Sequence, residues 1–226
     1  MGSCHSGTST AMSDLTPRLY LASPLITDVE LFAPQLEAAC KVGDIAAVLL
    51  RLAASDERAA IKQVKALAPI AQNEGAAVIV AGSPLVAIRG GADGVHISGT
   101  GSTAEAEAAL ETMKPDRIVG VGGLRSKHDA MVAGEMDIDY VMFGEPLPNA
   151  ALPPFAQVVE RAAWWAEIFA VPCVAFAPTL EDVTPLAETG VEFVAVGDAV
   201  WSAPDGPAKA VACALGALAS AEVPQR

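Results

Sequence analysis

The stretch IAAVLLRLAASDERAAIKQVKALAPIAQNEGAAVIV, residues 45–80, contains one complete unit of the fold. It begins with Ile45–Leu52, an apolar run broken only by Arg51, and ends with a second apolar run, Ala77–Val80. Between these runs, the alanine-rich segment Ser55–Glu74 has the composition of a helix. A strand that is apolar throughout is typical of a parallel sheet, because neither of its faces meets water. The stretch therefore predicts a strand, a helix and a second, parallel strand.

The same alternation runs along the whole chain. We expect strands at Arg18–Ser23, Ile45–Leu52, Ala77–Val80, Gly94–Ile97, Arg117–Val121, Asp139–Phe143, Cys173–Ala177 and Phe193–Val196. The last two helices are expected over Thr179–Thr189 and from Pro207 onward. Eight such units favour a closed (β/α)8 barrel, the TIM barrel of the α/β class, over an open sheet, and no dinucleotide-binding glycine pattern follows the first strand. We expect one barrel domain over residues 17–226, with function at the C-terminal ends of its strands.

Composition limits the partners and the compartment. The chain has 226 residues, 52% of them hydrophobic, and a net charge of -13. Such an acidic chain argues against nucleic acid and anionic membranes as partners, because both require basic surface. The four cysteines show no C-x-x-C spacing, which favours a reduced, cytoplasmic protein without a structural metal. Residues 1–16 are rich in Gly, Ser and Thr, lack the apolar core of a secretory signal, and are expected to be a disordered leader.

Several segments resemble one known family. Gly90–Ile97 reads GGADGVHI and is similar to the GADGVHLGQ signature of thiamine-phosphate synthases. Arg117–Val121 and Asp139–Gly144 resemble the IGVS and ADYVGVG region of the same family. Val171–Ala175 and Gly190–Val196 stand where the family's last two strands are expected. The similarity extends over almost the whole chain, which resembles the thiamine-phosphate synthase/TenI family.

The resemblance implies a phosphorylated heterocycle as ligand. In this family the synthase joins a thiazole phosphate to a hydroxymethylpyrimidine diphosphate and releases pyrophosphate, with Mg²⁺ and basic groups neutralising the leaving group. The sister protein TenI aromatises a thiazole phosphate and needs no diphosphate machinery.

The departures from the family pattern fall on the metal and phosphate positions. Gly82 and Gly101 stand where the resemblance implies the two Mg²⁺-binding carboxylates, and glycine has no side-chain oxygen. Arg51 matches the family's arginine, but its lysine partner is replaced by Ala53. Pro178 replaces a phosphate-binding glycine and removes a backbone donor. We therefore expect altered or lost synthase activity and no firmly bound metal.

Arg51 and Glu145 are the main candidates for chemistry. An arginine near the end of an apolar strand is expected to bind a ligand anion or to pair with an acidic residue, because burying it alone is costly. Glu145 follows the sixth strand, where the resemblance implies the proton-transfer histidine of TenI, so its carboxyl group is a candidate acid or base. The alternative is an ion pair between Glu145 and Arg51 across the barrel mouth.

The remaining candidates surround this pair. His96 ends the fourth strand, where a hydrogen-bonded core role is the main expectation and a ligand contact the alternative. Gly122, Gly123 and Arg125 follow the fifth strand and are candidates for binding an anion. The nearby Lys127 and His128 are equally well explained as solvated residues on a helix.

Gly197 and Asp198 follow the eighth strand, where barrels often bind phosphate on backbone N–H groups. The carboxylate of Asp198 would repel a phosphate and is expected to cap the last helix instead.

Three hypotheses follow for the whole chain: a divergent synthase, a metal-independent TenI-like isomerase that uses Glu145, and a non-catalytic barrel that binds a phosphate ligand. The apolar surplus is also compatible with a homo-oligomer.

Overall fold

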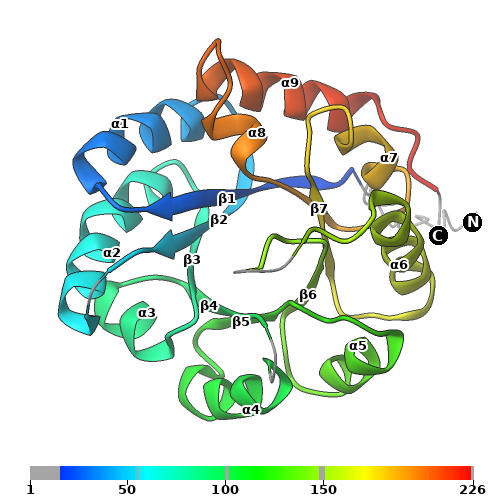
Figure 1. The fold of residues 1–226 in the computed structure, drawn as a ribbon, viewed down its shortest axis with the longest axis horizontal. Helices are drawn as coiled ribbons and strands as arrows, with labels where there is room; N and C mark the ends of the chain where they lie inside the picture. Colours follow the sequence, from blue (N-terminus) through cyan, green and yellow to red (C-terminus); the bar gives the residue numbers. More distant parts are fainter. Residues whose placement is uncertain (1–15, 55, 100–101, 148–150, 225–226) are drawn as a thin grey trace, which may run out of the picture.

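The computed structural model describes residues 16–54, 56–99, 102–147 and 151–224. In these ranges eight parallel strands form one closed barrel in sequence order (Figure 1). The strands are β1 (Arg18–Ile26), β2 (Ile45–Leu52), β3 (Ala77–Ala81), β4 (Gly94–Ile97), β5 (Ile118–Val121), β6 (Tyr140–Phe143), β7 (Cys173–Ala177) and β8 (Phe193–Val196). The predicted (β/α)8 barrel is thereby confirmed, whereas the predicted leader lies, except for Thr16, outside the described residues.

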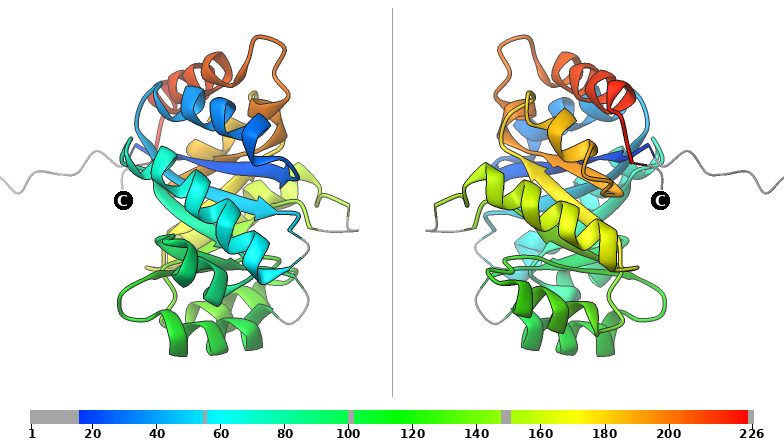
Figure 2. Two further views of the ribbon diagram at one scale, coloured as in Figure 1. Left: turned by 90° about the vertical axis from the view of Figure 1, so that its left-hand side faces the viewer. Right: turned by 90° about the vertical axis from the view of Figure 1, so that its right-hand side faces the viewer.

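Helices alternate with the strands and form a ring around the barrel (Figure 1). They are α1 (Val29–Cys40), α2 (Glu57–Gln72), α3 (Pro84–Gly90), α4 (Ser102–Met113), α5 (Lys127–Gly134), α6 (Phe155–Ile168), α7 (Val183–Ala187), α8 (Asp198–Trp201) and α9 (Pro207–Ser220). In side view, the described residues 144–147 and 151–154, which lie between β6 and α6, extend beyond the barrel on one face (Figure 2). Within the described ranges, no helix combines the length and the apolar character needed to cross a membrane.

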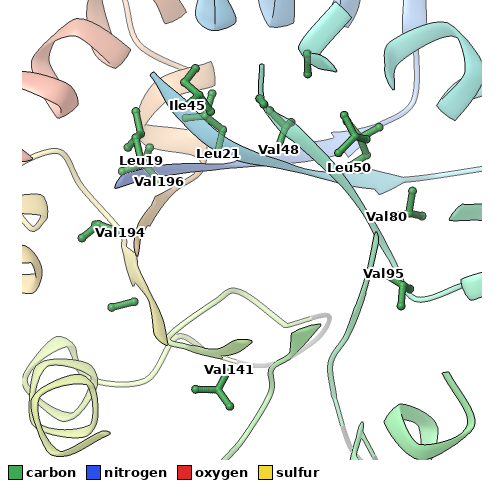
Figure 3. Close-up of a cluster of buried hydrophobic side chains, with 14 of the residues drawn as sticks. Leu19, Leu21, Ile45, Val48, Leu50, Val80, Val95, Val141, Val194 and Val196 are labelled. Carbon is green, nitrogen blue, oxygen red and sulfur yellow. The ribbon is translucent and has the colours of Figure 1, made fainter. Parts of the chain in front are cut away.

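Alternate residues of most strands belong to two separate hydrophobic layers. The outer layer lies between strands and helices, and its side chains, such as Leu19 and Leu21, point away from the barrel axis (Figure 3). The inner layer fills the barrel and includes Tyr20 and Leu49. Because strand side chains alternate, Arg51 falls on the same inner face as Leu49, at the C-terminal end of β2. The strand period therefore directs this arginine toward the barrel mouth.

The first strand is longer than predicted. It continues past Ser23 to Ile26, because its last residues pair with Arg51 and Leu52 of β2. This extension brings the Ser23 hydroxyl within 2.9 Å of the Arg51 backbone N–H, which donates a hydrogen bond to it.

The helix predicted over Thr179–Thr189 is shorter in the structure. Thr179 precedes α7, and its N–H and hydroxyl donate hydrogen bonds of 3.1 and 2.8 Å to the carboxylate of Asp182. These bonds hold a turn and delay the helix to Val183. The start of α2 also differs in detail, since Asp56 caps it and the expected first residue, Ser55, lies outside the described residues.

Candidate functional site

Two buried polar side chains meet at the C-terminal mouth of the barrel. His96 on β4 is 2% exposed, and Glu145, just after β6, is 9% exposed. Glu145 Oε1 lies 3.8 Å from His96 Nε2 and accepts a hydrogen bond from the Gly123 backbone N–H. His96 Nε2 itself has no hydrogen-bond partner among the described residues. The mouth thus contains a buried carboxyl group beside an imidazole nitrogen whose hydrogen bonding is incomplete.

Gly122 makes room for this pair. A Cβ at Gly122 would overlap Glu145 Oε1 and would come within 2.7 Å of His96 Nε2. The next residue, Gly123, has a φ of +70°, a conformation that glycine adopts without strain, and this turns its N–H toward Glu145. The two glycines predicted to bind an anion therefore form a space and a donor for Glu145 instead.

His96 continues into a buried hydrogen-bonded chain. Its Nδ1 lies 3.1 Å from the Tyr140 hydroxyl, which lies 3.0 Å from the Tyr20 hydroxyl. Burial raises the pKa of both phenols above the usual range, so both keep their protons. Gly120 makes this possible, because a Cβ there would overlap the Tyr140 ring. The expectation that His96 is a hydrogen-bonded interior residue agrees with this arrangement.

A cavity of about 490 Å³ lies next to Glu145, bounded by the β5–α5 connection, the chain after β6, and α6. Arg125 and Arg161 line it together with Glu145. Arg161 donates hydrogen bonds of 3.1 and 2.6 Å to the backbone carbonyls of Leu124 and Arg125, which fix its guanidinium group on the cavity wall. In the described part of the chain, neither arginine forms an ion pair with a carboxylate. The cavity therefore combines two unneutralised cations with one acid–base group.

The two neighbours of Arg125 have other surroundings. Lys127 forms an ion pair of 3.0 Å with Glu160 and lies over the Trp164 ring, and His128 is exposed. Neither residue lines the cavity. Their interpretation as solvated helix residues agrees with this placement.

Arg51 is half-buried near the C-terminal end of β2 and does not line the cavity beside Glu145. Across the described residues, no ion pair within 4.0 Å joins Arg51 to Glu145 or to any other carboxylate. The predicted alternative of an Arg51–Glu145 pair is therefore wrong for this structure, because Glu145 is already held by Gly123 and faces His96.

The end of β8 differs from the prediction. Gly197 is buried, and a Cβ there would lie 3.0 Å from the Phe176 ring, so this aromatic side chain covers the glycine. Asp198 is exposed and begins the four-residue helix α8, whereas Gly206 precedes the last helix, α9. The expectation that Asp198 caps the last helix is wrong, because a short helix that the sequence did not indicate separates the two.

The two positions where the family's metal ligands were expected, Gly82 and Gly101, carry no side-chain oxygen. Gly82 is exposed with a φ of +92°, and no atom lies within 4 Å of the place where its Cβ would be. Gly101 lies outside the described residues. Within the described ranges, no three His, Cys, Asp or Glu side chains cluster closely enough to hold a metal ion.

Sequence reasoning missed three residues of this site: Tyr20, Tyr140 and Arg161. The period of two along β1 and β6 indicates that both tyrosines face the barrel interior, but their contact depends on barrel closure. Arg161 lies on α6, and no motif or spacing indicated that it folds back over the β5–α5 connection.

The chain was compared with known proteins. The family model described as thiamine monophosphate synthase matches residues 19–200. A thiamine-phosphate synthase of Rhodospirillum centenum is 42% identical over 197 residues, which cover 86% of this chain and 94% of that protein. A thiamine-phosphate synthase of Hyphomonas neptunium is 36% identical over 214 residues, 90% of this chain and 95% of that protein.

Solved structures agree in fold. The thiamine phosphate pyrophosphorylase from Pyrococcus furiosus superposes with a TM-score of 0.74 at 24% identity, over 90% of this chain and 96% of that one. The 3-hexulose-6-phosphate synthase from Salmonella typhimurium superposes with a TM-score of 0.69 at 14% identity, over 91% of this chain and 100% of that one. These likenesses support the barrel, and the sequence matches identify the lineage: this chain belongs to the thiamine monophosphate synthase family.

Proposed function

We propose that this chain is a thiamine-phosphate synthase that couples a thiazole phosphate to a hydroxymethylpyrimidine diphosphate. In this reaction a bond forms from the thiazole to the pyrimidine's methylene carbon as the bond from that carbon to the diphosphate breaks, and pyrophosphate leaves. The observation that carries the proposal is the 42% identity to a thiamine-phosphate synthase over 86% of the chain. The site we assign to it is the cavity beside Glu145.

Arg125 and Arg161 are our candidates for holding a phosphate group. The chain carries a net charge of -13, so an anionic ligand needs a local concentration of positive charge. Two guanidinium groups on one cavity wall supply it, and guanidinium binds phosphate through paired N–H donors. Arg161 uses part of its donors on backbone carbonyls and keeps others for a ligand. Arg51, on the inner face of β2, is a further candidate for an anion that reaches across the mouth.

Members of this family generally use Mg²⁺, and the described donor set does not fit the expected site. Gly82 offers no side chain, and Glu145 is the only carboxylate among the described residues that line the large cavity. Its Oε1 is engaged by the Gly123 N–H. We therefore assign no step to a metal ion and propose that the arginines take over part of the charge neutralisation.

The test is a synthase assay on the full chain with both substrates, run with Mg²⁺ and with a chelator. We expect thiamine phosphate and pyrophosphate in equal amounts. Arg125→Ala and Arg161→Ala should each lower kcat/KM about 10- to 100-fold, the equivalent of about 1.5–3 kcal/mol for a hydrogen bond to a charged group. Lys127→Ala is the matched control, because Lys127 lies next to the site without lining it. No thiamine phosphate under either condition would exclude the proposal.

A second candidate function is supported by Glu145 itself. A buried carboxyl group that borders a ligand-sized cavity fits a proton-transfer reaction, as in a metal-independent isomerisation of a thiazole phosphate. In that case Glu145→Gln should abolish isomerisation and leave binding of the phosphate ligand intact. Retained turnover in the variant rules out the isomerase role, and binding without turnover in the unmodified chain leaves the non-catalytic barrel.

The partners and compartment also belong to this proposal. We propose a cytoplasmic protein that binds a small phosphorylated heterocycle and no nucleic acid, in line with its acidity. A homo-oligomer is supported by Leu25, near the end of β1, and Leu31, in the first turn of α1, whose side chains are 58% and 70% exposed. Sedimentation of the purified protein tests this point.

A further inference from the structure

The starting observation is the unsatisfied Nε2 atom of His96. A buried polar atom without a partner is rare in native structures, because it has lost its hydrogen bonds to water. This atom faces the Glu145 carboxylate at 3.8 Å, across the space that Gly122 leaves empty. The distance is too long for a hydrogen bond, yet short enough to close with a small rotation of the Glu145 side chain.

The tautomer of His96 follows from a count of donors along the chain. Tyr140 is the one hydrogen-bond partner of the Tyr20 hydroxyl among the described residues. If Tyr20 donates to Tyr140 and Tyr140 donates to His96 Nδ1, each phenolic hydrogen has an acceptor. The proton of the neutral imidazole then lies on Nε2 and points at Glu145. The reverse direction leaves the Tyr20 hydroxyl hydrogen without an acceptor in the described part of the barrel, and it turns the lone pair of Nε2, instead of an N–H, toward the Glu145 oxygen 3.8 Å away.

We propose that the tyrosine pair holds His96 as its Nε2–H tautomer and that His96 is a positioning residue for Glu145, which acts on the bound ligand as a general base. The inference deepens the second candidate function, the isomerisation of a thiazole phosphate, because the coupling reaction takes no proton from the heterocycle, and it rests on that candidate for the identity of the ligand. Glu145 touches the cavity and is the catalytic residue, whereas His96 does not line the cavity and acts through Glu145.

The proton balance of the step is simple. The Gly123 N–H donates a hydrogen bond to Oε1, and the His96 Nε2–H points at the same oxygen from 3.8 Å. The other carboxylate oxygen, Oε2, is therefore left for the ligand. Glu145 takes a proton from the heterocycle, an O–H bond forms on the carboxyl group, and the electron pair stays on the ligand. The same group later returns that proton. Hydrogen bonds of this kind are often long before the ligand binds, so we expect the 3.8 Å separation to shorten in the complex.

The groups around Glu145 agree with a carboxylate in this role. Arg125 and Arg161, from the β5–α5 connection and α6, line the same cavity as Glu145. His96 faces it from β4, and the phenols of Tyr140 and Tyr20 beyond His96 keep their protons because burial raises their pKa.

The experiment is ¹⁵N NMR of the imidazole in the full-length protein, without ligand and with thiazole phosphate. We expect the Nε2–H tautomer of His96 in the unmodified chain, and a further downfield Nε2–H proton signal when the ligand is added. Tyr140→Phe removes the donor to Nδ1 and should produce a mixture of tautomers, with a smaller change in Tyr20→Phe. Thr189→Val is the matched control, because it removes a hydrogen-bonded hydroxyl far from the mouth.

Kinetics supply the second readout. Tyr140→Phe should lower kcat about tenfold with KM unchanged, the size expected when an outer partner of a functional group is lost. An Nδ1–H tautomer in the unmodified chain, or an unchanged tautomer in Tyr140→Phe, overturns the inference. If the unmodified chain does not isomerise the thiazole phosphate, the second candidate function and the general-base role of Glu145 both fail, while the NMR result still decides the tautomer of His96.

Discussion

Replacing Gly122 by alanine places a methyl group between His96 and Glu145. The new Cβ overlaps Glu145 Oε1, which is the free end of a flexible side chain that borders a cavity. We expect the carboxylate to swing into this cavity and to regain water. The variant loses the hydrogen bond to the Gly123 N–H, which is worth about 1.5–3 kcal/mol for a charged group. Alanine also restricts the unfolded chain more than glycine does, and this stabilises the folded state by about 0.4–1 kcal/mol. The net loss is about 1–2 kcal/mol.

Gly120→Ala is the matched comparison, because Gly120 lies in β5 two residues before Gly122. Its methyl group meets the ring of Tyr140, which is buried and hydrogen-bonded to Tyr20 and His96. A shift of the ring into the cavity of about 380 Å³ that it lines at the N-terminal ends of the strands would cost these bonds. Overpacking of about 1–3 kcal/mol therefore adds to the loss of two buried hydrogen bonds of about 1 kcal/mol each. We expect a loss of about 3–5 kcal/mol.

Urea unfolding followed by tryptophan fluorescence measures both losses, and turnover is measured on the folded fraction. Gly122→Ala should remain folded with a melting temperature lowered by about 2–8 °C, yet lose its activity because Glu145 has left its place. Gly120→Ala should be the much less stable variant. If both variants lose the same stability, or if Gly122→Ala keeps full turnover, the assignment of this space to the His96–Glu145 pair is wrong.

Three further predictions concern stability and reactivity. Trp165→Phe should lower the free energy of unfolding by about 2–4 kcal/mol in a urea titration, because the indole is fully buried and donates a 2.7 Å hydrogen bond to a backbone carbonyl. Labelling with a maleimide at pH 8, mapped by mass spectrometry, should modify the exposed Cys213 and spare Cys40, where burial raises the thiol pKa to about 11. The hydrogen bond from Arg18 lowers the pKa of Asp44, so the pair stabilises the fold above about pH 4 and this stabilisation is lost as the pH falls further. Asp44→Asn should remove this change of the free energy of unfolding with pH. The change is at most about 1 kcal/mol, because the pair is exposed.

The barrel could be predicted because its signal is local. Each strand is a short apolar run and each helix follows it directly, so the alternation is readable without any tertiary contact. The boundaries were less accurate where long-range pairing or side-chain turns decide them. Strand β1 continues to Ile26 through its pairing with β2, and Asp182 delays α7.

The site was predictable where sequence neighbours are also neighbours in space. Glu145 and Arg125 follow adjacent strands, β6 and β5, and the structure places both on one cavity. Arg51 lies in β2 and Asp198 follows β8, and neither residue lines this cavity. The Tyr20–Tyr140 contact joins residues 120 positions apart, and no local pattern could indicate it.

The scarcity of charge at the strand ends has a physical consequence for where a ligand can bind. Phe176 covers Gly197 at the β7–β8 end, where phosphate often binds in such barrels. The ionisable groups that border the large cavity are concentrated instead at β5 and β6, where Glu145 meets Arg125 and Arg161. We therefore propose that a phosphate ligand binds next to Glu145, so that binding and proton transfer depend on the same few side chains. Substitutions of these arginines should then change KM and kcat together, whereas substitutions in the buried tyrosine pair should change kcat alone.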